Sequence, residues 1–424
     1  MKKVLLAVSL LTVLCLLSSC MMISGSGLES MFGSSSADPQ PLTLGKQTDD
    51  GDTVTISREE YLNYQRLQKF SELADLYEDA EKYFFREPDT EKMMEYAAKG
   101  LLAGLDDPYT FYYSPEEFQK MLEDDEGRYV GIGVMILSDF NEDTCVISRV
   151  FKGGPAEEAG VMRGDILYRV GEDLYVTPEN VNEAVNIMRG EPGTSVDVTF
   201  MRDGEEITFN IVRREIQVNQ VESTMLEPGI GYIALYEFAG EADKEFENAL
   251  DELTEQGIDG LIIDLRDNSG GWVLQAQTIG DLFMDAGDLC YLVYRDGSEE
   301  HLYRTRDGKT DVKLVVLVNE MSASSSEILT GALRDSADAT VVGTQTFGKG
   351  IVQSVLQSGD QGAGFQITVA EYFSPKGNKV HEVGIEPDVI VERPEGDKGN
   401  YDFADVEKDV QLRTALEVMR EKLK

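Results

Sequence analysis

The first regular pattern in the chain is a helical spacing of apolar residues after residue 57. Apolar side chains recur at every third position there, and the stretches 93–105 and 115–122 also show helical periodicity. The recurring residues are Tyr61, Tyr64, Leu67, Phe70, Leu73 and Leu76. We predict a helical N-terminal region over 57–126, which either packs against the rest of the chain or forms a homodimer.

The pattern changes at residue 127. Short runs of alternating apolar residues, separated by Gly and Pro turns, continue to residue 215 with one helical stretch at 178–188. This is typical of a small β-rich module. From 216 to 398, apolar strands instead alternate with helices. The predicted strands are 231–235, 260–265 and 313–318, and the predicted helices are 243–256, 273–284 and 324–335.

Strands that alternate with helices form βαβ units with a parallel sheet. We therefore predict an α/β fold for the core at 216–398. The remaining segment, 399–424, is charged and amphipathic, and residues 401–424 are expected to form a closing helix.

The N-terminus has the pattern of an export signal. Lys2 and Lys3 precede an apolar run over 4–17, and Leu17-Ser18-Ser19-Cys20 follows. This end resembles the bacterial lipobox, which implies a lipoprotein signal peptide over 1–20 and a lipid on Cys20. An uncleaved signal anchor is the alternative. Both place the protein on the outer face of the cytoplasmic membrane, with 21–56, rich in Gly, Ser, Asp and Thr, as a flexible spacer.

The net charge of the chain limits the classes of molecule that it can bind. Acidic residues outnumber basic ones by 79 to 38, and the formal net charge is -41, so nucleic acid is excluded as a partner. Cys145 and Cys290 lie in different predicted modules, so no disulfide framework is expected. The sequence has no His-Glu-x-x-His zinc motif, no Gly-x-Ser-x-Gly motif and no phosphate-binding loop. We expect neither a metal nor a cofactor.

Four ordered glycine motifs mark the β-rich module at 127–215. They are Gly131-Ile132-Gly133-Val134, Gly154-Pro155-Ala156, Gly164-Asp165-Ile166-Leu167 and Arg189-Gly190. Together they resemble the PDZ domains of bacterial proteases. The resemblance implies that backbone N–H groups at Ile132, Gly133 and Val134 bind the terminal carboxylate of a protein tail, which adds a strand to the sheet. The Arg189 segment is a candidate for coupling this module to a catalytic site.

Two segments of the core contain the candidate chemistry. The first, 318–328, includes Ser322, Ser324 and Ser326 and opens a predicted helix; taken alone, a Ser-rich N-cap explains it. The second, 343–353, contains Gly348-Lys349-Gly350. Together they resemble the carboxyl-terminal processing peptidases, or tail-specific proteases. The resemblance implies a crotonase/ClpP-like protease core with an inserted PDZ domain.

By this resemblance Ser324 is the nucleophile and Lys349 the general base, with Gln353 orienting the lysine from one helical turn away. Ser322 and Ser326 are the rival nucleophiles. The backbone N–H groups of Gly270 and Ser325 are expected to form the oxyanion hole. For Glu327 and Asp335, direct participation and a structural role remain alternatives.

Two positions depart from the family pattern. Met321 stands where relatives usually have glycine, and Ser325 where they usually have alanine; a bulky residue at 321 is expected to resist a positive φ. Burial must lower the pKa of the catalytic lysine from ~10.4 toward about 7 or 8, while an acidic surface opposes that shift. The predicted function is a serine endopeptidase for proteins with exposed C-terminal tails. A non-catalytic PDZ scaffold and a small-molecule esterase or amidase are the alternatives.

Overall fold

The computed structural model describes residues 46–47, 53–54, 57–125, 127–139, 142–303, 310–359, 362–394, 397, 401 and 403–424. These residues belong to two compact units, one up to Ser114 and the other from Pro115 to Lys424. The predicted signal peptide, its lipid-bearing Cys20 and most of the spacer lie outside the described residues. Across the ranges given above, no helix is both long and apolar enough to cross a membrane.

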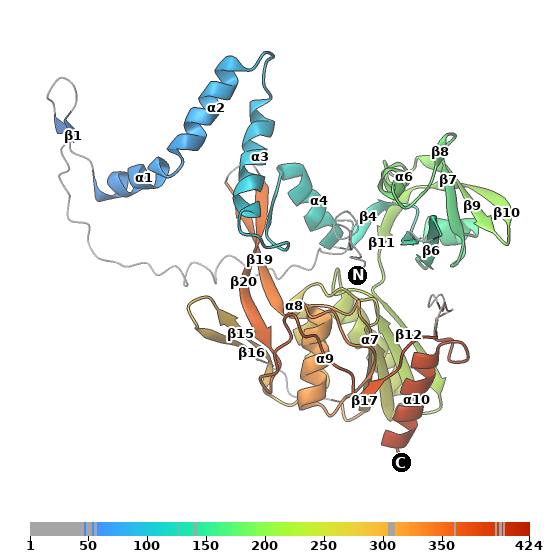
Figure 1. Ribbon diagram of the computed structural model, residues 1–424. Coiled ribbons are helices and arrows are strands. Elements are labelled where there is room, and N and C mark those ends of the chain that lie inside the picture. Colours follow the sequence, from blue (N-terminus) through green and yellow to red (C-terminus); the bar gives the residue numbers. More distant parts are fainter. Residues whose placement is uncertain are drawn as a thin grey trace, which may run out of the picture. The chain divides into compact units, whose positions relative to one another are not determined.

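The N-terminal unit contains helices, as predicted (Figure 1). Its described elements are β1 (Lys46–Gln47), β2 (Thr53–Val54), α1 (Arg58–Gln68), α2 (Ser71–Tyr83), α3 (Thr90–Ala103) and β3 (Phe111–Tyr113). Ser57 caps α1, because its hydroxyl accepts the N–H of Glu60 (3.1 Å) while the Glu60 carboxylate accepts the N–H of Ser57 (2.7 Å). The apolar period predicted over 61–76 is divided between the two helices α1 and α2. None of the residues of α1, α2 or α3 is buried.

The β-rich module forms one sheet with the strand order β10-β9-β7-β6-β5, and β8 pairs with β7. Its elements are β5 (Val134–Asp139), β6 (Thr144–Val150), α5 (Pro155–Ala159), β7 (Ile166–Val170), β8 (Leu174–Tyr175), α6 (Val181–Met188), β9 (Ser195–Arg202) and β10 (Glu205–Val212). It has its own hydrophobic core, which includes Ile147, Leu167 and Phe200. Two antiparallel strands, β4 (Arg128–Gly131) and β11 (Arg214–Gln217), lead into and out of the module.

The core is built on a second sheet with the order β12-β13-β14-β17-β18-β21. Its strands are β12 (Val221–Glu227), β13 (Ile230–Leu235), β14 (Gly260–Asp264), β17 (Lys313–Val318), β18 (Thr340–Gly343) and β21 (Val389–Ile390). β12 is antiparallel to β13, and the pairs from β13 to β21 are parallel. The βαβ architecture predicted from the sequence is confirmed.

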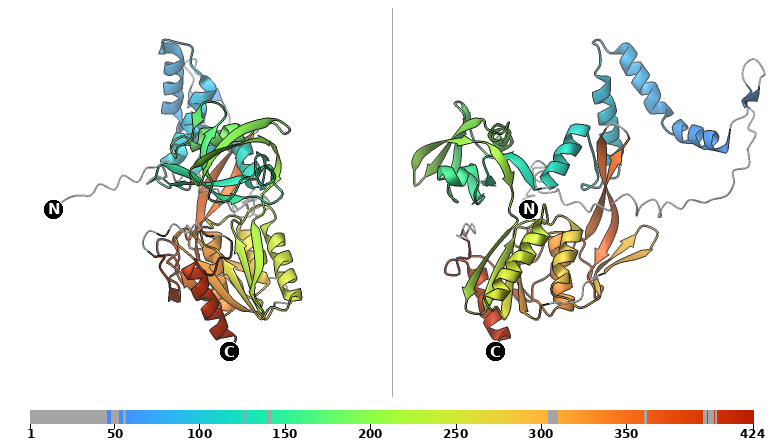
Figure 2. Two further views of the ribbon diagram at one scale, coloured as in Figure 1. Left: turned by 90° about the vertical axis from the view of Figure 1, so that its right-hand side faces the viewer. Right: turned by 180° about the vertical axis from the view of Figure 1, so that it is seen from behind.

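Helices cover both faces of this sheet, because its strands are apolar at successive positions and alternate between faces. Leu261 and Ile263 of β14 pack with α7 (Ala242–Glu255), α8 (Val273–Asp281) and α9 (Ser325–Ser336). Ile262, between them, packs on the other face with α10 (Val410–Lys422). Figure 2 shows these helices around the sheet from two further sides.

A further antiparallel sheet has the strand order β16-β15-β20-β19. Its strands are β15 (Asp288–Tyr294), β16 (Glu299–Tyr303), β19 (Ile351–Ser358) and β20 (Ala363–Phe373). The helix α4 (Pro115–Asp125) packs against β20, where a side chain at Gly364 would lie 2.3 Å from the ring of Phe118.

The closing helix is shorter than predicted. It begins at Val410 instead of near residue 401. Ala404 has a φ of 59°, which no α-helix contains. The Asp409 carboxylate then caps the helix by accepting the N–H groups of Gln411 and Leu412, both at 3.0 Å.

Candidate active site

Three loops of the core begin at the carboxyl ends of neighbouring parallel strands. The loop 265–271 follows β14, 319–324 follows β17 and 344–350 follows β18. Adjacent parallel strands end at the same edge of a sheet, where ligand sites of α/β folds lie. These loops contain the predicted residues Gly270, Ser324 and Lys349, so the fold brings the predicted catalytic segments to one edge.

Ser324 has a backbone conformation that L-residues rarely adopt, with φ 53° and ψ −115°. Such a conformation costs about 1–3 kcal/mol and persists only where the surroundings impose it. Here the carbonyl of Ser324 accepts the hydroxyl of buried Tyr372 (3.1 Å) and the N–H of Ile328 (2.9 Å). A strained serine between a strand and a helix is also the geometry of the Gly-x-Ser-x-Gly turn, whose sequence this chain lacks.

The hydroxyls of the neighbouring serines are already engaged. Ser322 donates to the carbonyl of Leu265 (2.7 Å), Ser325 to that of Gly271 (2.7 Å) and Ser326 to that of Asn268 (2.9 Å). The Ser324 hydroxyl donates to no backbone carbonyl in the described part of the chain, and its side chain is 5% exposed. The assignment of the nucleophile stays a prediction, and these bonds favour Ser324 over Ser322 and Ser326.

The carboxylate of Glu327 connects the segments of Ser324 and Lys349. Its Oε2 accepts the N–H of Ser324 (3.0 Å) and the N–H of Lys349 (2.9 Å). Its Oε1 accepts the N–H of Gly348 (2.8 Å) and the hydroxyl of Thr346 (2.5 Å). The residue is fully buried. Burial raises the pKa of Glu327, and these four donors oppose the rise because they favour the ionised form.

Lys349 is buried, with 2% of its surface exposed, as the predicted role of a lysine base requires. The proposed position of Gln353 relative to it was wrong. Residues 351–358 form strand β19 and not a helix, because Ile351 and Val352 begin an alternating, β-branched run. The side-chain amide of Gln353 donates to the hydroxyl of Thr368 on β20 (3.2 Å), and among the described residues it donates to no other group.

The backbone N–H groups predicted to form the oxyanion hole differ in whether they already donate a hydrogen bond. Gly270 has a φ of 109° and lies against Ser324, since a Cβ at Gly270 would be 2.8 Å from the Cβ of Ser324. Its N–H, however, donates to the side chain of Asn268 (2.9 Å). The N–H groups of Gly271 and Ser325 have no acceptor among the residues that the structure describes. Ser325 is the first residue of α9, where the helix dipole favours negative charge.

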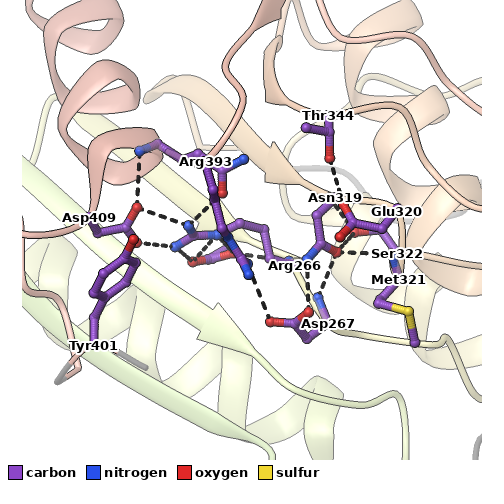
Figure 3. A network of polar contacts seen from close by, with 12 residues as sticks. Arg266, Asp267, Asn319, Glu320, Met321, Ser322, Thr344, Arg393, Tyr401 and Asp409 are labelled. Carbon is purple, nitrogen blue, oxygen red and sulfur yellow. Dashed lines mark hydrogen bonds and ion pairs between the residues drawn. The ribbon is translucent and has the colours of Figure 1, made fainter. Parts of the chain in front are cut away.

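A polar network fixes the loop that contains Gly270 (Figure 3). Arg266 donates to both carboxylate oxygens of Asp409, the N-cap of α10, at 2.7 and 3.1 Å, and to Asp264 on β14 at 2.6 Å. Burial alone would lower the pKa of Arg266, but these carboxylates raise it well above its ordinary value. The closing helix is therefore bound, through one buried guanidinium, to the loop that lies against Ser324.

The same network continues to the loop that precedes Ser324 (Figure 3). The side chain of Asn319 accepts the N–H of Asp267 (2.9 Å) and the N–H of Met321 (3.1 Å), and donates to Asp267 (2.8 Å). Met321 is not among the residues with positive φ. The expected strain at this departure from the family pattern is thus absent, and Ser324 is the strained residue instead.

The contacts of Asp335 fit a structural role better than direct participation in catalysis. Its carboxylate accepts the hydroxyl of Ser374 (2.6 Å) and the N–H of Lys376 (3.1 Å), which fixes the turn after β20. Two residues that the sequence did not single out, Thr346 and Tyr372, bond the Glu327 carboxylate and the Ser324 carbonyl. Thr346 lies in the segment 343–353 that contains Lys349, so its position in the sequence could have indicated a place in the site. Tyr372 lies on strand β20, and no motif in the sequence marks it.

The predicted tail-binding residues form the turn between β4 and β5. Gly133 has a φ of 86°, and the carbonyl of Ile132 accepts the N–H of Ala156 (2.8 Å). β5, which begins at Val134, is the last strand in its sheet, so its outer edge pairs with no other described strand. A cavity of about 290 Å³ lies beside this turn, and its lining includes Val134 and Val185 of α6.

No group of three or more His, Cys, Asp or Glu side chains that could hold a metal ion occurs in the described ranges. Cys145 and Cys290 are buried and do not form a disulfide. Burial raises the pKa of both thiols, so neither has the depressed pKa of a reactive cysteine.

The α/β core with its buried lysine, its strained serine and an inserted PDZ module defines a serine peptidase. Residues 229–391 match peptidase family S41, and residues 128–212 match the PDZ domain. The chain is 36% identical to the carboxyl-terminal-processing protease of Synechocystis sp., over 80% of each chain. It is 35% identical to the carboxy-terminal processing protease CtpA of Bacillus subtilis, over 80% of this chain and 72% of that one.

A solved structure, the photosystem II D1 C-terminal processing protease, is 30% identical with a TM-score of 0.49 and covers 74% of this chain and 85% of that chain. The family match and the two curated relatives show that the chain belongs to peptidase family S41, the carboxyl-terminal processing serine proteases. The predicted family, fold class and enzyme class are confirmed.

Proposed function

We propose that the chain is an endopeptidase in which Ser324 is the nucleophile and Lys349 the general base. The main support is the buried Glu327 carboxylate, one oxygen of which accepts the N–H groups of both residues. This bond fixes the backbone of the serine relative to that of the lysine. The Lys349 side chain is also buried, as the role of a lysine base requires.

Catalysis then follows the usual course of nucleophilic acyl transfer. The Ser324 oxygen attacks the scissile carbonyl while its proton passes to the neutral amine of Lys349. The lysine next protonates the leaving amine, and an ester to Ser324 remains. Water, deprotonated by the same lysine, hydrolyses this ester. The developing oxyanion is stabilised by N–H groups of the Gly270-Gly271 turn and of Ser325 at the start of α9.

Substrates are proteins with exposed C-terminal tails. The positive φ of Gly133 and the unpaired outer edge of β5 support this proposal, because a tail can place its carboxylate at the turn and add a strand to the edge. The apolar side chains of the adjacent cavity, including Val134, Val185 and Met188, favour an apolar last residue on that tail.

The N-terminal region supports two further proposals. Lipid on Cys20 tethers the protein to the outer face of the cytoplasmic membrane, so Cys20→Ser should move it to the soluble fraction.

The second proposal is a homodimer through the N-terminal unit. It is supported by α1 to α3, which have no buried residues and expose large apolar side chains. The exposed residues include Leu62, Leu67, Leu76, Tyr83, Phe84, Phe85, Met94 and Tyr96. Deletion of 57–114 should then convert a dimer to a monomer in sedimentation.

The mechanism is tested by hydrolysis of unfolded β-casein in the presence of EDTA. Wild type should cleave with divalent metal chelated, and Ser324→Ala and Lys349→Ala should be inactive although folded. Ser326→Ala is the matched control, because it removes a buried hydroxyl from α9, two positions from Ser324, and should leave most activity. Activity in Ser324→Ala would refute the mechanism. A wild type that stays inactive even with tail peptides added would favour the scaffold alternative.

A further inference from the structure

The loop that contains Lys349 exposes a large aromatic side chain. Phe347 is 54% exposed, although Thr346 before it and Gly348, Lys349 and Gly350 after it are all buried. The loop therefore packs into the core on both sides of Phe347 and leaves the apolar surface of this residue in water. Covering such a surface is favourable, because it releases the water that surrounds it.

The backbone of Phe347 is held next to the segment of Ser324. Its N–H donates to the carbonyl of Ser322 (3.0 Å). The next residue, Gly348, donates its N–H to Oε1 of Glu327 (2.8 Å), and Ser324 donates its N–H to Oε2 of the same carboxylate (3.0 Å). Phe347 is thus one residue away from a group that shares a carboxylate with Ser324.

A second exposed apolar residue, Val383, belongs to a segment in direct contact with this loop. The N–H of Glu382 donates to the carbonyl of Gly348 (2.9 Å), and a Cβ at Gly348 would be 3.2 Å from the backbone nitrogen of Val383. The side chain of Gln345 donates to the carbonyl of Val383. Val383 is 52% exposed. We call Phe347 and Val383 together the apolar lip.

The place of the apolar lip points to a substrate contact. Single exposed apolar side chains are common on protein surfaces, but neighbouring ones beside a catalytic site are typical of ligand contacts. A chain that presents its scissile carbonyl to Ser324 passes close to Phe347, because one carboxylate binds the backbone of Ser324 and of the residue after Phe347. A large apolar side chain next to the scissile bond would cover the lip, whereas a small polar one would leave it in water.

We propose that the apolar lip determines cleavage specificity, and that Phe347 contacts a large apolar substrate side chain next to the scissile bond. This inference rests on the proposed function, in which Ser324 is the nucleophile. It adds a second point of selection: the PDZ module selects the end of the tail, and the lip selects the site of cleavage. Phe347 takes no part in proton transfer.

The test measures specificity rather than total activity. The sites that wild type cleaves in β-casein are mapped by mass spectrometry, and the position next to the scissile bond with the stronger apolar preference is chosen. Two internally quenched peptides then carry leucine or serine at that position. Both end in valine with a free carboxyl group, so that tail recognition is the same for the two.

Wild type should cleave the leucine peptide with a kcat/KM about 10-fold higher than the serine peptide. Phe347→Ala should lower this ratio about 5-fold, and Phe347→Leu, which keeps a large apolar side chain, should retain most of it. Tyr175→Ala is the matched control, because it removes an aromatic side chain that is 57% exposed in the PDZ module, and it should keep the wild-type ratio. A purely structural role for Phe347 would lower kcat/KM for both peptides equally and leave the ratio unchanged.

The outcomes separate this inference from the proposed function. If wild type cleaves through Ser324 but shows no apolar preference at either position, or if Phe347→Ala keeps the wild-type ratio, the lip does not select the cleavage site and the Ser-Lys mechanism stands. If Ser324→Ala cleaves both peptides like wild type, the proposed nucleophile is wrong, and the inference fails with it.

Discussion

Replacement of Glu327 by glutamine tests how the active site is assembled. The two carboxylate oxygens accept four donors, two on each oxygen. Glutamine keeps one oxygen and puts an NH₂ group in place of the other, so two donors face a donor instead of an acceptor. Hydrogen bonds to a charged group contribute about 1.5–3 kcal/mol each, which gives an upper range of about 3–6 kcal/mol for the pair.

Relief from burying a charge offsets part of this loss, because burial raises the pKa of Glu327. We therefore expect Glu327→Gln to lower the free energy of unfolding, measured in urea, by about 3 kcal/mol. If the same loss appears in the transition state, kcat/KM for casein falls about 100-fold. Glu320→Gln is the control, since that exposed carboxylate accepts a single bond from Thr344. Wild-type stability and activity in Glu327→Gln would refute the claim that this carboxylate positions Ser324 and Lys349.

Three other predictions follow from the same geometry. Gly270→Ala places a Cβ 2.8 Å from the Cβ of Ser324 and should reduce casein hydrolysis at least 100-fold. Gly257→Ala, also at positive φ but in open space, should retain this activity. Asp409→Asn leaves a buried guanidinium without one of its charged partners and should lower the free energy of unfolding by about 3 kcal/mol. Glu227→Gln removes an exposed ion pair and should change the free energy of unfolding little. The base must be neutral, so kcat/KM should rise with pH, and added salt should move its acid limb to lower pH by screening the net charge of -41; an acid limb that ignores salt would contradict this last prediction.

The sequence predicted which loops of the core meet at one edge of the sheet. It did not predict the hydrogen bonds between these loops. Apolar strands such as 260–264 and 313–318 alternate with helices, so the edge at which the loops of Gly270 and Ser324 meet follows from the pattern. The four donors of Glu327 could not be predicted, because three of them come from residues 346–349, in a separate loop. Hydrogen-bond partners depend on the packing of loops, which periodicity does not report.

Two of the predictions that the structure corrected, the position of Gln353 and the start of the closing helix, failed for local reasons. The spacing of Lys349 and Gln353 fits one helical turn, but the β-branched residues between them favour a strand, and strand pairing with β20 decided the outcome. The charged, amphipathic pattern continues from residue 401 to the end of the chain, so it predicted a helix that starts there. The helix begins later because Ala404 has a positive φ and Asp409 is the N-cap of α10. The bond from Arg266 to Asp409 joins residues 143 positions apart and had no sequence signal.

The most direct test of the central claim is to locate the acyl group during turnover. Wild type, Ser324→Ala and Lys349→Ala would be mixed with an activated peptide ester, quenched in acid, digested and mapped by mass spectrometry. An activated ester should acylate the enzyme faster than the acyl-enzyme hydrolyses, so the adduct accumulates. We predict the acyl mass on the peptide that contains Ser324, no adduct in Ser324→Ala, and much slower formation in Lys349→Ala. An adduct on Ser322 or Ser326, or turnover that EDTA abolishes without any adduct, would contradict the account.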